Sequence, residues 1–301
     1  MRKNRGIQTV DSETLGLGYG FLGVLCFSLT LPATRAAVAD LDPNIVGIGR
    51  AIVAAGLAMM VLWVTRQPIP NRQHWKSLAV VAGGVIVGFP LLSAMAMQQL
   101  PASHAAVVNG ILPLATAIAA TIQLGERPSM QFWFASLLGS ATIIVFAVIS
   151  GAGQMHGADV VLIFAGVAAA FGYAEGGRLA QFMGGWQTIC WALVLAAPFL
   201  ILPTAIAVWQ HGLNASPTAW IGFAYVSIIS QFLAFFAWYK GLALGGVARV
   251  GQIQLLQPFL TIFASALLLG EKITPITLVA AVVVVATVAF GKSATIQRYR
   301  S

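Results

Sequence analysis

Long apolar stretches dominate the chain, and only short polar gaps interrupt them. A transmembrane helix needs about 20 mostly apolar residues to cross the hydrocarbon core of a bilayer. Ten stretches reach that length, so the pattern predicts ten spanning helices and leaves almost no chain for a soluble domain. Their expected bounds are 16–39, 44–64, 76–99, 102–124, 129–149, 157–178, 184–209, 217–240, 247–269 and 274–290.

The composition agrees with this pattern. Hydrophobic residues make up 59% of the 301 positions and charged residues only 8%, whereas a soluble domain has roughly 25% charged residues. The net charge of +8 could indicate a nucleic-acid partner. The basic residues are scattered among the short gaps and form no binding face, so we expect a lipid bilayer as the partner and no nucleic acid.

Lysine and arginine favour one side of the expected membrane. With the N-terminus in the cytoplasm, thirteen of them fall in cytoplasmic tails, loops or helix ends, and only Lys272 falls in an opposite loop. Cytoplasmic loops are enriched in Lys and Arg. The sequence therefore predicts a multi-pass protein with both termini in the cytoplasm. The first apolar run has no small-residue cleavage site after it and is expected to remain as a helix.

The two halves of the chain share a motif. The stretch "PLATAIAATIQLGERPS" (113–129) aligns with "PFLTIFASALLLGEKIT" (258–274) at an offset of 145 residues. Pro113 then meets Pro258, and Glu126 meets Glu271. At an offset of 143, "GFLGVLCFSLTLPATR" (20–35) aligns with "IFAGVAAAFGYAEGGR" (163–178). The chain thus reads as a duplication.

Each half has five expected helices, and an odd number makes the second copy enter from the other face. The predicted fold is an all-α membrane protein, with ten transmembrane helices forming an inverted five-plus-five repeat around a central cavity. The expected parts are a cytoplasmic tail (1–14), a first repeat (15–150), a second repeat (151–291) and a cytoplasmic tail (292–301). Inverted repeats are typical of secondary transporters, whose substrate sites lie near the midplane.

The doubled "LGE" plus basic residue, with a proline in the middle of the same helix, resembles the EamA-type drug/metabolite transporter superfamily over roughly residues 15–292. Within that group the chain is similar to the bacterial aromatic amino acid exporters of the inner membrane. The resemblance implies a cavity lined by helices 1, 3, 4, 6, 8 and 9, alternating access and outward movement of metabolites.

The mid-helix prolines mark the first candidate site. Proline gives no N–H to the carbonyl four residues back, so Pro113 and Pro258 are expected to free the carbonyls of Asn109 and Gln254. Polar groups facing lipid are costly. We therefore predict that Asn109, Gln254 and Gln257 face the cavity, where an amide can bind both the carboxylate and the ammonium of a zwitterion. The alternative is hydrogen bonding between helices.

Aromatic residues supply the second candidate site. An aromatic wall suits a substrate with a ring or an apolar side chain, and it can also hold an ammonium group. The alternative for the pair beside Lys240 is an ordinary membrane-interface position. The candidates are Gln231, Phe235, Trp238 and Tyr239 on helix 8, Phe27 on helix 1 and Tyr173 on helix 6.

Charged residues inside the expected helices are few. Glu175 and Arg178 share a helix face and are expected to pair, and Arg50 could pair with Asp40 or Asp42. No carboxylate is expected at mid-depth, which argues against a carboxylate proton relay and favours facilitated, gradient-driven export. Without a fixed mid-depth charge, selectivity is expected to be loose.

Further residues are assigned structural or gating roles. Prolines kink helices, and glycines four apart let helices approach closely. The glycine pairs are Gly16 with Gly20, Gly84 with Gly88, and Gly241 with Gly245. Glu126 and Glu271 are expected to cap helix ends, and Arg35 is expected at the outer end of helix 1. The full set of gating candidates is Pro32, Pro90, Pro113, Pro258, Glu126, Glu271, Arg35 and Arg178.

An enzyme finds little support in the sequence. The four histidines are scattered, no two have metal-ligand spacing, and Cys26 and Cys190 suggest no disulfide or metal site. We expect no cofactor, no metal and no catalytic residues. The predicted function is export of amino acids, aromatic and other apolar ones, with a monomer as the working expectation. A carrier for another metabolite or a lipophilic drug is the first alternative, and a non-transporting scaffold or membrane enzyme the second.

Overall fold

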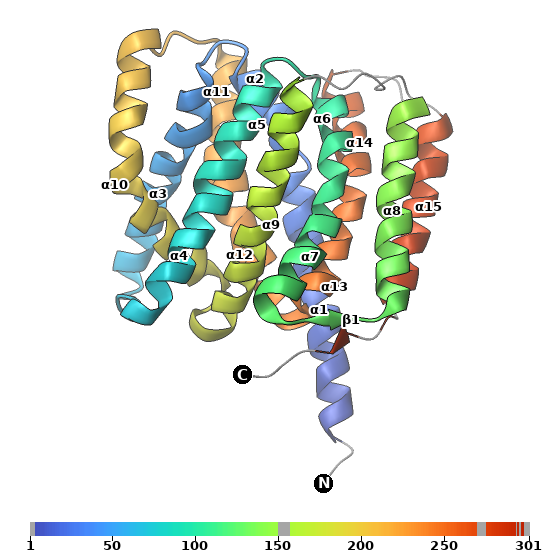
Figure 1. The fold of residues 1–301 in the computed structure, drawn as a ribbon. Coiled ribbons are helices and arrows are strands. Elements are labelled where there is room, and N and C mark those ends of the chain that lie inside the picture. Colours follow the sequence, from blue (N-terminus) through green and yellow to red (C-terminus); the bar gives the residue numbers. More distant parts are fainter. Residues whose placement is uncertain (1–3, 150–156, 270–274, 293, 295, 298–301) are drawn as a thin grey trace.

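The computed structural model describes residues 4–149, 157–269, 275–292, 294 and 296–297 as a bundle of roughly aligned helices (Figure 1). Its helical segments join end to end into about ten rods, and seven helices are long and apolar enough to cross a membrane. The segments are α1 (Asn4–Phe27), α2 (Thr30–Ala37), α3 (Arg50–Val64), α4 (Trp75–Val81), α5 (Phe89–Met97), α6 (Ala102–Val108), α7 (Leu112–Leu124), α8 (Met130–Ile149), α9 (Gly157–Met183), α10 (Gly185–His211), α11 (Pro217–Ala224), α12 (Ala234–Gly245), α13 (Val247–Gly251), α14 (Gln257–Leu269) and α15 (Pro275–Lys292).

Apolar side chains cover the outside of the bundle. Phe199 on α10, Phe134 on α8 and Leu267 on α14 are all exposed, and Trp209 exposes 85% of its surface. Soluble monomers rarely expose large contiguous apolar patches. A bilayer satisfies such a surface, and the helices satisfy their own backbone groups. The fold is therefore that of an all-α membrane protein.

Several rods are interrupted near their middle, and side chains from other rods complete the breaks. Between α1 and α2 the helix breaks at Ser28 and Leu29, because Pro32 offers no N–H to the Ser28 carbonyl. The hydroxyl of Thr261 on α14 donates to that carbonyl at 2.7 Å. Wider π-helical turns join α4 to α5 (Ala82–Gly88) and α11 to α12 (Tyr225–Leu233).

The interruptions repeat along the chain. Helices α7 (Leu112–Leu124) and α14 (Gln257–Leu269) match end to end at an offset of 145 residues, and a 3₁₀ segment precedes each. Of the three π segments in the described residues, those that begin at Ala82 and Tyr225 lie 143 positions apart, whereas Ile45–Gly49 before α3 has no counterpart in α10. The related rods pack in opposite directions, since α6 contacts α14 while α7 contacts α13. The offsets found in the sequence thus reappear at these irregularities, whereas α9 is continuous where the related α1–α2 rod is broken.

One expectation about the prolines is wrong. The 3₁₀ turns redirect the preceding N–H groups, so Leu112 donates to the carbonyl of Asn109 and Gln257 donates to that of Gln254. These carbonyls are therefore not freed for a substrate. A 3₁₀ turn bonds residues three apart, which lets the residue just before the proline supply the missing donor. The polar groups that remain available here are the side-chain amides.

The expected glycine contact joins α1 to α12. A Cβ at Gly16 would lie 2.4 Å from the backbone nitrogen of Gly245, and one at Gly241 would lie 2.7 Å from that of Gly20. Real Cβ atoms do not approach this closely, so the two helices touch backbone to backbone. The paired small residues set this distance, as in other membrane helix pairs.

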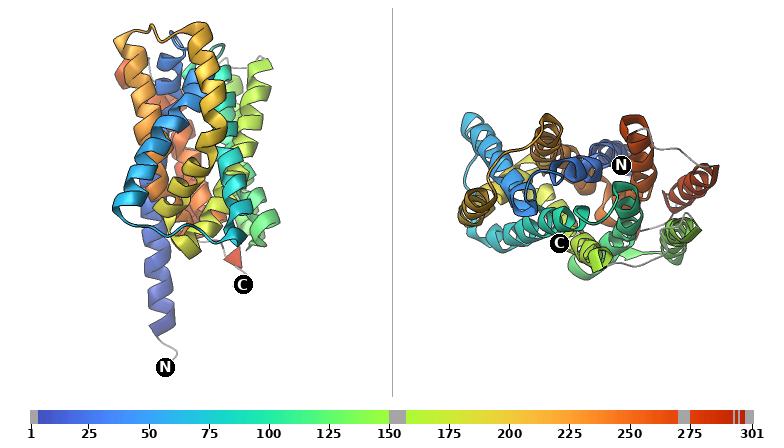
Figure 2. Two further views of the ribbon diagram at one scale, coloured as in Figure 1. Left: turned by 90° about the vertical axis from the view of Figure 1, so that its left-hand side faces the viewer. Right: turned by 90° about the horizontal axis from the view of Figure 1, so that it is seen from above.

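Two very short strands modify the all-α expectation. β1 (Arg127–Pro128) pairs antiparallel with β2 (Ile296–Gln297) at the end of the bundle from which α1 projects (Figure 1). We name this the termini end, and the opposite end, where α5 ends and α6 begins, the far end. Both described ends of the chain lie at the termini end, and Figure 2 shows the same arrangement from the side and from above.

Candidate functional site

A narrow central cavity lies where the interrupted rods meet. The space between its lining atoms totals about 400 Å³, but facing side chains leave room for little more than water in any one place. Seven rods contribute to it, through residues on both sides of the breaks. The lining residues are Phe27, Thr30, Leu31, Arg50, Val85, Phe89, Asn109, Leu112, Tyr173, Ser230, Gln231, Phe235 and Gln257. The helices implied by the resemblance all contribute, and α3 adds Arg50.

Three of the four predicted amides line this cavity. The Asn109 side chain is buried, and its Oδ1 atom has no hydrogen-bond partner. The amide of Gln231 donates to the Val85 carbonyl at 3.0 Å, and that of Gln257 donates to the Phe27 carbonyl at 3.5 Å. These two amides therefore satisfy backbone carbonyls at the interruptions of other rods, which agrees with the alternative of hydrogen bonding between helices.

Gln254 lies outside the lining. Its Oε1 accepts a hydrogen bond from the Thr116 hydroxyl at 3.2 Å, while its Nε2 has no partner. Gln254 belongs to the 3₁₀ segment before α14, and its buried side chain reaches Thr116 on α7. In this conformation Gln254 stands behind the cavity wall.

The predicted aromatic residues form one cluster. The ring centroids of Phe27 and Phe235 lie 5.1 Å apart, and those of Tyr173 and Trp238 lie 5.3 Å apart. Phe27, Tyr173 and Phe235 line the cavity. Trp238 backs them, with its ring 6.0 Å from that of Phe27. The side of the cavity nearest α12 is therefore an aromatic wall.

The interface alternative for Trp238 and Tyr239 is wrong. Both side chains are fully buried, whereas interface aromatics extend to the lipid headgroups. The Tyr239 hydroxyl donates to the Gly172 carbonyl on α9 at 3.2 Å, and its ring occupies the space left by Gly176. They support the wall from behind and do not line the cavity.

Arg50 contradicts two expectations. It is 1% exposed and lines the cavity, so a fixed cation does lie within the bundle. It does not pair with Asp40 or Asp42. Asp40 accepts from the Ser216 backbone at 2.9 Å, and Asp42 from the Asn44 side chain at 2.9 Å. Both acids lie in the loop before α3, while Arg50 begins α3 and points inward.

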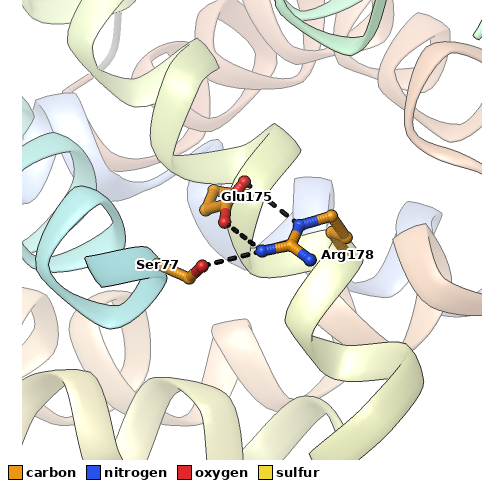
Figure 3. Close-up of polar contacts among 3 residues, drawn as sticks. All are labelled: Ser77, Glu175 and Arg178. Atoms are coloured by element: carbon orange, nitrogen blue, oxygen red, sulfur yellow. Dashed lines mark hydrogen bonds and ion pairs between the residues drawn. The ribbon is translucent and has the colours of Figure 1, made fainter. Parts of the chain in front are cut away.

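Polar contacts close the termini end of the bundle. Glu126, after α7, accepts hydrogen bonds from the backbone N–H groups of Val247 at 3.1 Å and Ala248 at 2.9 Å. It thus caps the N-terminus of α13 on the other half of the chain. On α9 the expected pair forms, with Arg178 2.6 Å from Glu175. Figure 3 shows Arg178 also reaching Ser77 on α4, at 2.7 Å.

A second set of contacts closes the far end. Arg35 on α2 donates to the Met97 carbonyl at the end of α5. The Nε2 atom of His104 on α6 lies 2.7 Å from Oδ1 of Asp159 on α9. The sequence does not predict this contact, because the two residues are 55 positions apart. Hydrogen bonds from Ser216 favour the ionised carboxylate and hold the pKa of Asp40 below its usual value. The cavity is therefore closed toward both ends.

Within the described part of the chain, no three His, Cys, Asp or Glu side chains group together as metal ligands would. The described residues lining the cavity include no acid. Glu271, the repeat partner of Glu126, lies outside the described residues.

Relatives of the chain are transporters by name. It is 44% identical over 265 residues to "Uncharacterized transporter YdeK" of Bacillus subtilis (strain 168), covering 88% of this chain and 92% of that protein. It is 26% identical over 290 residues to the "Probable terminal-alkyne amino-acid exporter" of Streptantibioticus cattleyicolor, covering 93% of this chain and 94% of that protein.

The fold is shared with a solved structure. A crystal structure superimposes with a TM-score of 0.73 over 92% of this chain and 98% of that one, at 18% sequence identity. The EamA-like transporter family matches twice, over residues 14–148 and 156–290, which indicates a repeat. With both halves matched, the chain belongs to the EamA-like transporter family, a family of membrane transporters and not of enzymes.

Proposed function

We propose that this transporter exports amino acids, including aromatic and other apolar ones, across the bacterial inner membrane. One observation carries the proposal: a buried cavity combines amide side chains with an aromatic wall. The amides of Asn109, Gln231 and Gln257 suit the polar end of an amino acid, and Phe27, Tyr173 and Phe235 suit its side chain. The relative named as a probable amino-acid exporter supports the same substrate class.

The proposed architecture is an inverted repeat of five plus five spanning helices, residues 15–150 and 151–291, between cytoplasmic tails 1–14 and 292–301. The opposite packing of α6–α7 against α13–α14 supports it. So does the position of both described chain ends at the termini end, since an even number of crossings returns the chain to the same side. The Lys and Arg distribution assigns that side to the cytoplasm.

Alternating access would open one end of the cavity at a time. The contacts of Arg178 and Glu126 close the termini end, and the contact of Arg35 closes the far end. The breaks next to Pro32, Pro90, Pro113 and Pro258 are the proposed hinges, because irregular backbone can change its dihedral angles without unwinding a regular helix. The lack of an acid among the described lining residues favours export down a gradient, without a carboxylate proton relay.

Exchange in liposomes tests this function. Purified protein in vesicles loaded with phenylalanine is expected to take up labelled phenylalanine, and unlabelled leucine, tyrosine and tryptophan are expected to compete. Competition only by nucleosides or lipophilic drugs would favour a different metabolite or drug as the substrate. A folded, reconstituted sample that exchanges nothing in the panel would favour a scaffold and contradict the proposal.

A further inference from the structure

Arg50 is the least compensated charged side chain in the described bundle. It exposes 1% of its surface, and its Nε and Nη1 atoms have no hydrogen-bond partner. Within the described residues, no carboxylate lies within ion-pair distance of Arg50, whereas Arg178 pairs with Glu175 and Arg249 pairs with Glu13. The guanidinium nevertheless lines the central cavity.

Burying a cation without a counter-ion costs free energy, and binding an anion beside it offsets that cost. Arginine cannot shed its charge as lysine can, and its planar fork matches a carboxylate with two parallel hydrogen bonds. The Nε and Nη1 atoms of Arg50 have no partner, and each can form such a pair of parallel hydrogen bonds together with Nη2. The cavity wall therefore presents unpaired donors that suit one anionic, planar group, and the narrow cavity has to widen to admit it.

We propose that Arg50 binds the carboxylate of the transported molecule and makes that carboxylate a requirement for transport. The inference rests on the proposed function and narrows it to small monocarboxylates with an apolar side chain. Asn109 supplies the matching acceptor, since it lines the same cavity and its unpartnered Oδ1 atom can accept a hydrogen bond from an ammonium group. The aromatic wall receives the side chain.

The surroundings favour a carboxylate over a phosphate or a dianion. Arg50 is the one cation among the described lining residues, so it balances a single negative charge. The remaining lining is aromatic, aliphatic or neutral and polar. A phosphate carries up to two negative charges and several acceptor oxygens, and this lining would leave most of them uncompensated.

Substrate analogues give the first test, in the same exchange assay with labelled phenylalanine. Phenylalanine amide and phenethylamine keep the ring and the ammonium but lack the carboxylate, and we expect each to compete at least about tenfold more weakly than phenylalanine. 3-Phenylpropionate keeps the carboxylate and lacks the ammonium, and it should still compete. Equal competition by the amide and the amine would overturn the inference while leaving amino acid transport in place.

Variants of Arg50 give the second test, with melting temperature in detergent as a readout independent of transport. 3-Phenylpropionate should raise the melting temperature of wild type. Arg50→Met removes an uncompensated charge, so this variant should melt no lower than wild type. It should nevertheless fail to exchange phenylalanine, and 3-phenylpropionate should no longer raise its melting temperature. Arg50→Lys keeps the positive charge but lacks the planar guanidinium, so it should retain part of the exchange activity and part of the stabilisation by 3-phenylpropionate. Arg72→Gln, at an exposed loop position, is the matched control and should behave as wild type.

The two tests separate the possible failures. If wild-type protein exchanges no amino acid but carboxylates raise its melting temperature only when Arg50 is present, the carboxylate site stands and amino acid export fails. If Arg50→Met melts far below wild type and carboxylates stabilise both equally, Arg50 has a structural role and the inference is wrong. Equal stabilisation of wild type by chloride would also overturn it, because a spherical ion does not use the fork.

Discussion

At the residue scale, Asn109 combines burial with an unused acceptor. Because its Oδ1 atom has no partner, replacing it should remove a substrate contact without breaking a hydrogen bond of the protein. A hydrogen bond to a charged group contributes about 1.5–3 kcal/mol, so Asn109→Leu should weaken substrate binding by about 10- to 100-fold. The measurement is the concentration dependence of phenylalanine exchange in liposomes.

Asn214→Leu provides the control for this variant, because Asn214 is exposed in the loop between α10 and α11. It should exchange phenylalanine like wild type. Both variants should keep the wild-type melting temperature within a few degrees. Unchanged exchange by Asn109→Leu would remove Asn109 from the proposed site.

The sequence predicts for some site residues, but not for all, that they face the cavity. Asn109, Gln231 and Gln257 are predictable, because an amide in the middle of an apolar run must avoid lipid. Arg50 is not predictable in this way. It lies eight and ten positions after Asp42 and Asp40, so a local ion pair is equally consistent with the sequence. Only the packing of α3 against the other rods reveals that Arg50 faces the cavity.

At the scale of the helices, the contact between α1 and α12 depends on the absence of side chains. Gly16→Leu would place a Cβ 2.4 Å from the Gly245 backbone and force the two helices apart. Overpacking of this kind costs about 1–3 kcal/mol. We expect a clearly lower melting temperature in detergent. Gly18→Leu, also on α1, is the control, because a Cβ there meets nothing within 4 Å; equal effects of both changes would contradict the close contact.

The break between α1 and α2 depends on Thr261 of α14. Thr261→Val keeps the shape of the side chain but removes the donor to the Ser28 carbonyl. A buried carbonyl left without its partner costs about 1–3 kcal/mol. The variant should therefore melt several degrees lower than wild type. The exposed Thr218→Val should not, and equal melting of all three proteins would show that another donor satisfies the break.

Helix positions follow from the sequence much better than helix irregularities do. The expected segment 247–269 corresponds to the described run from α13 through α14, and 157–178 corresponds to the first part of α9. Runs of apolar residues specify where a span lies but do not distinguish α, π and 3₁₀ turns. The β1–β2 pair also escapes prediction, because it joins two-residue segments about 170 positions apart.

At the scale of the whole molecule, the repeat explains where the site is. The related breaks before α7 and α14 meet across the bundle, since α6 contacts α14 and α7 contacts α13. A duplicated unit inserted in the opposite direction places equivalent irregular segments at one depth. The cavity lies at that depth, and separate contacts close each end of it.

Orientation in the membrane is the last property that the sequence and the fold predict together. The loop before α4 carries Arg72 and lies at the termini end, whereas the loop after α10 lies at the far end (Figure 1). Gln73 and Leu213 are exposed in these two loops. In a background with Cys26 and Cys190 replaced by alanine, Leu213→Cys should react in intact cells with a membrane-impermeant maleimide. Gln73→Cys should react only after the cells are opened, because the positively charged end faces the cytoplasm. The reverse labelling pattern would contradict the proposed orientation, because it would place the termini outside the cytoplasm. Reaction of both cysteines in intact cells would contradict the odd number of spans that the proposed arrangement places between these two loops.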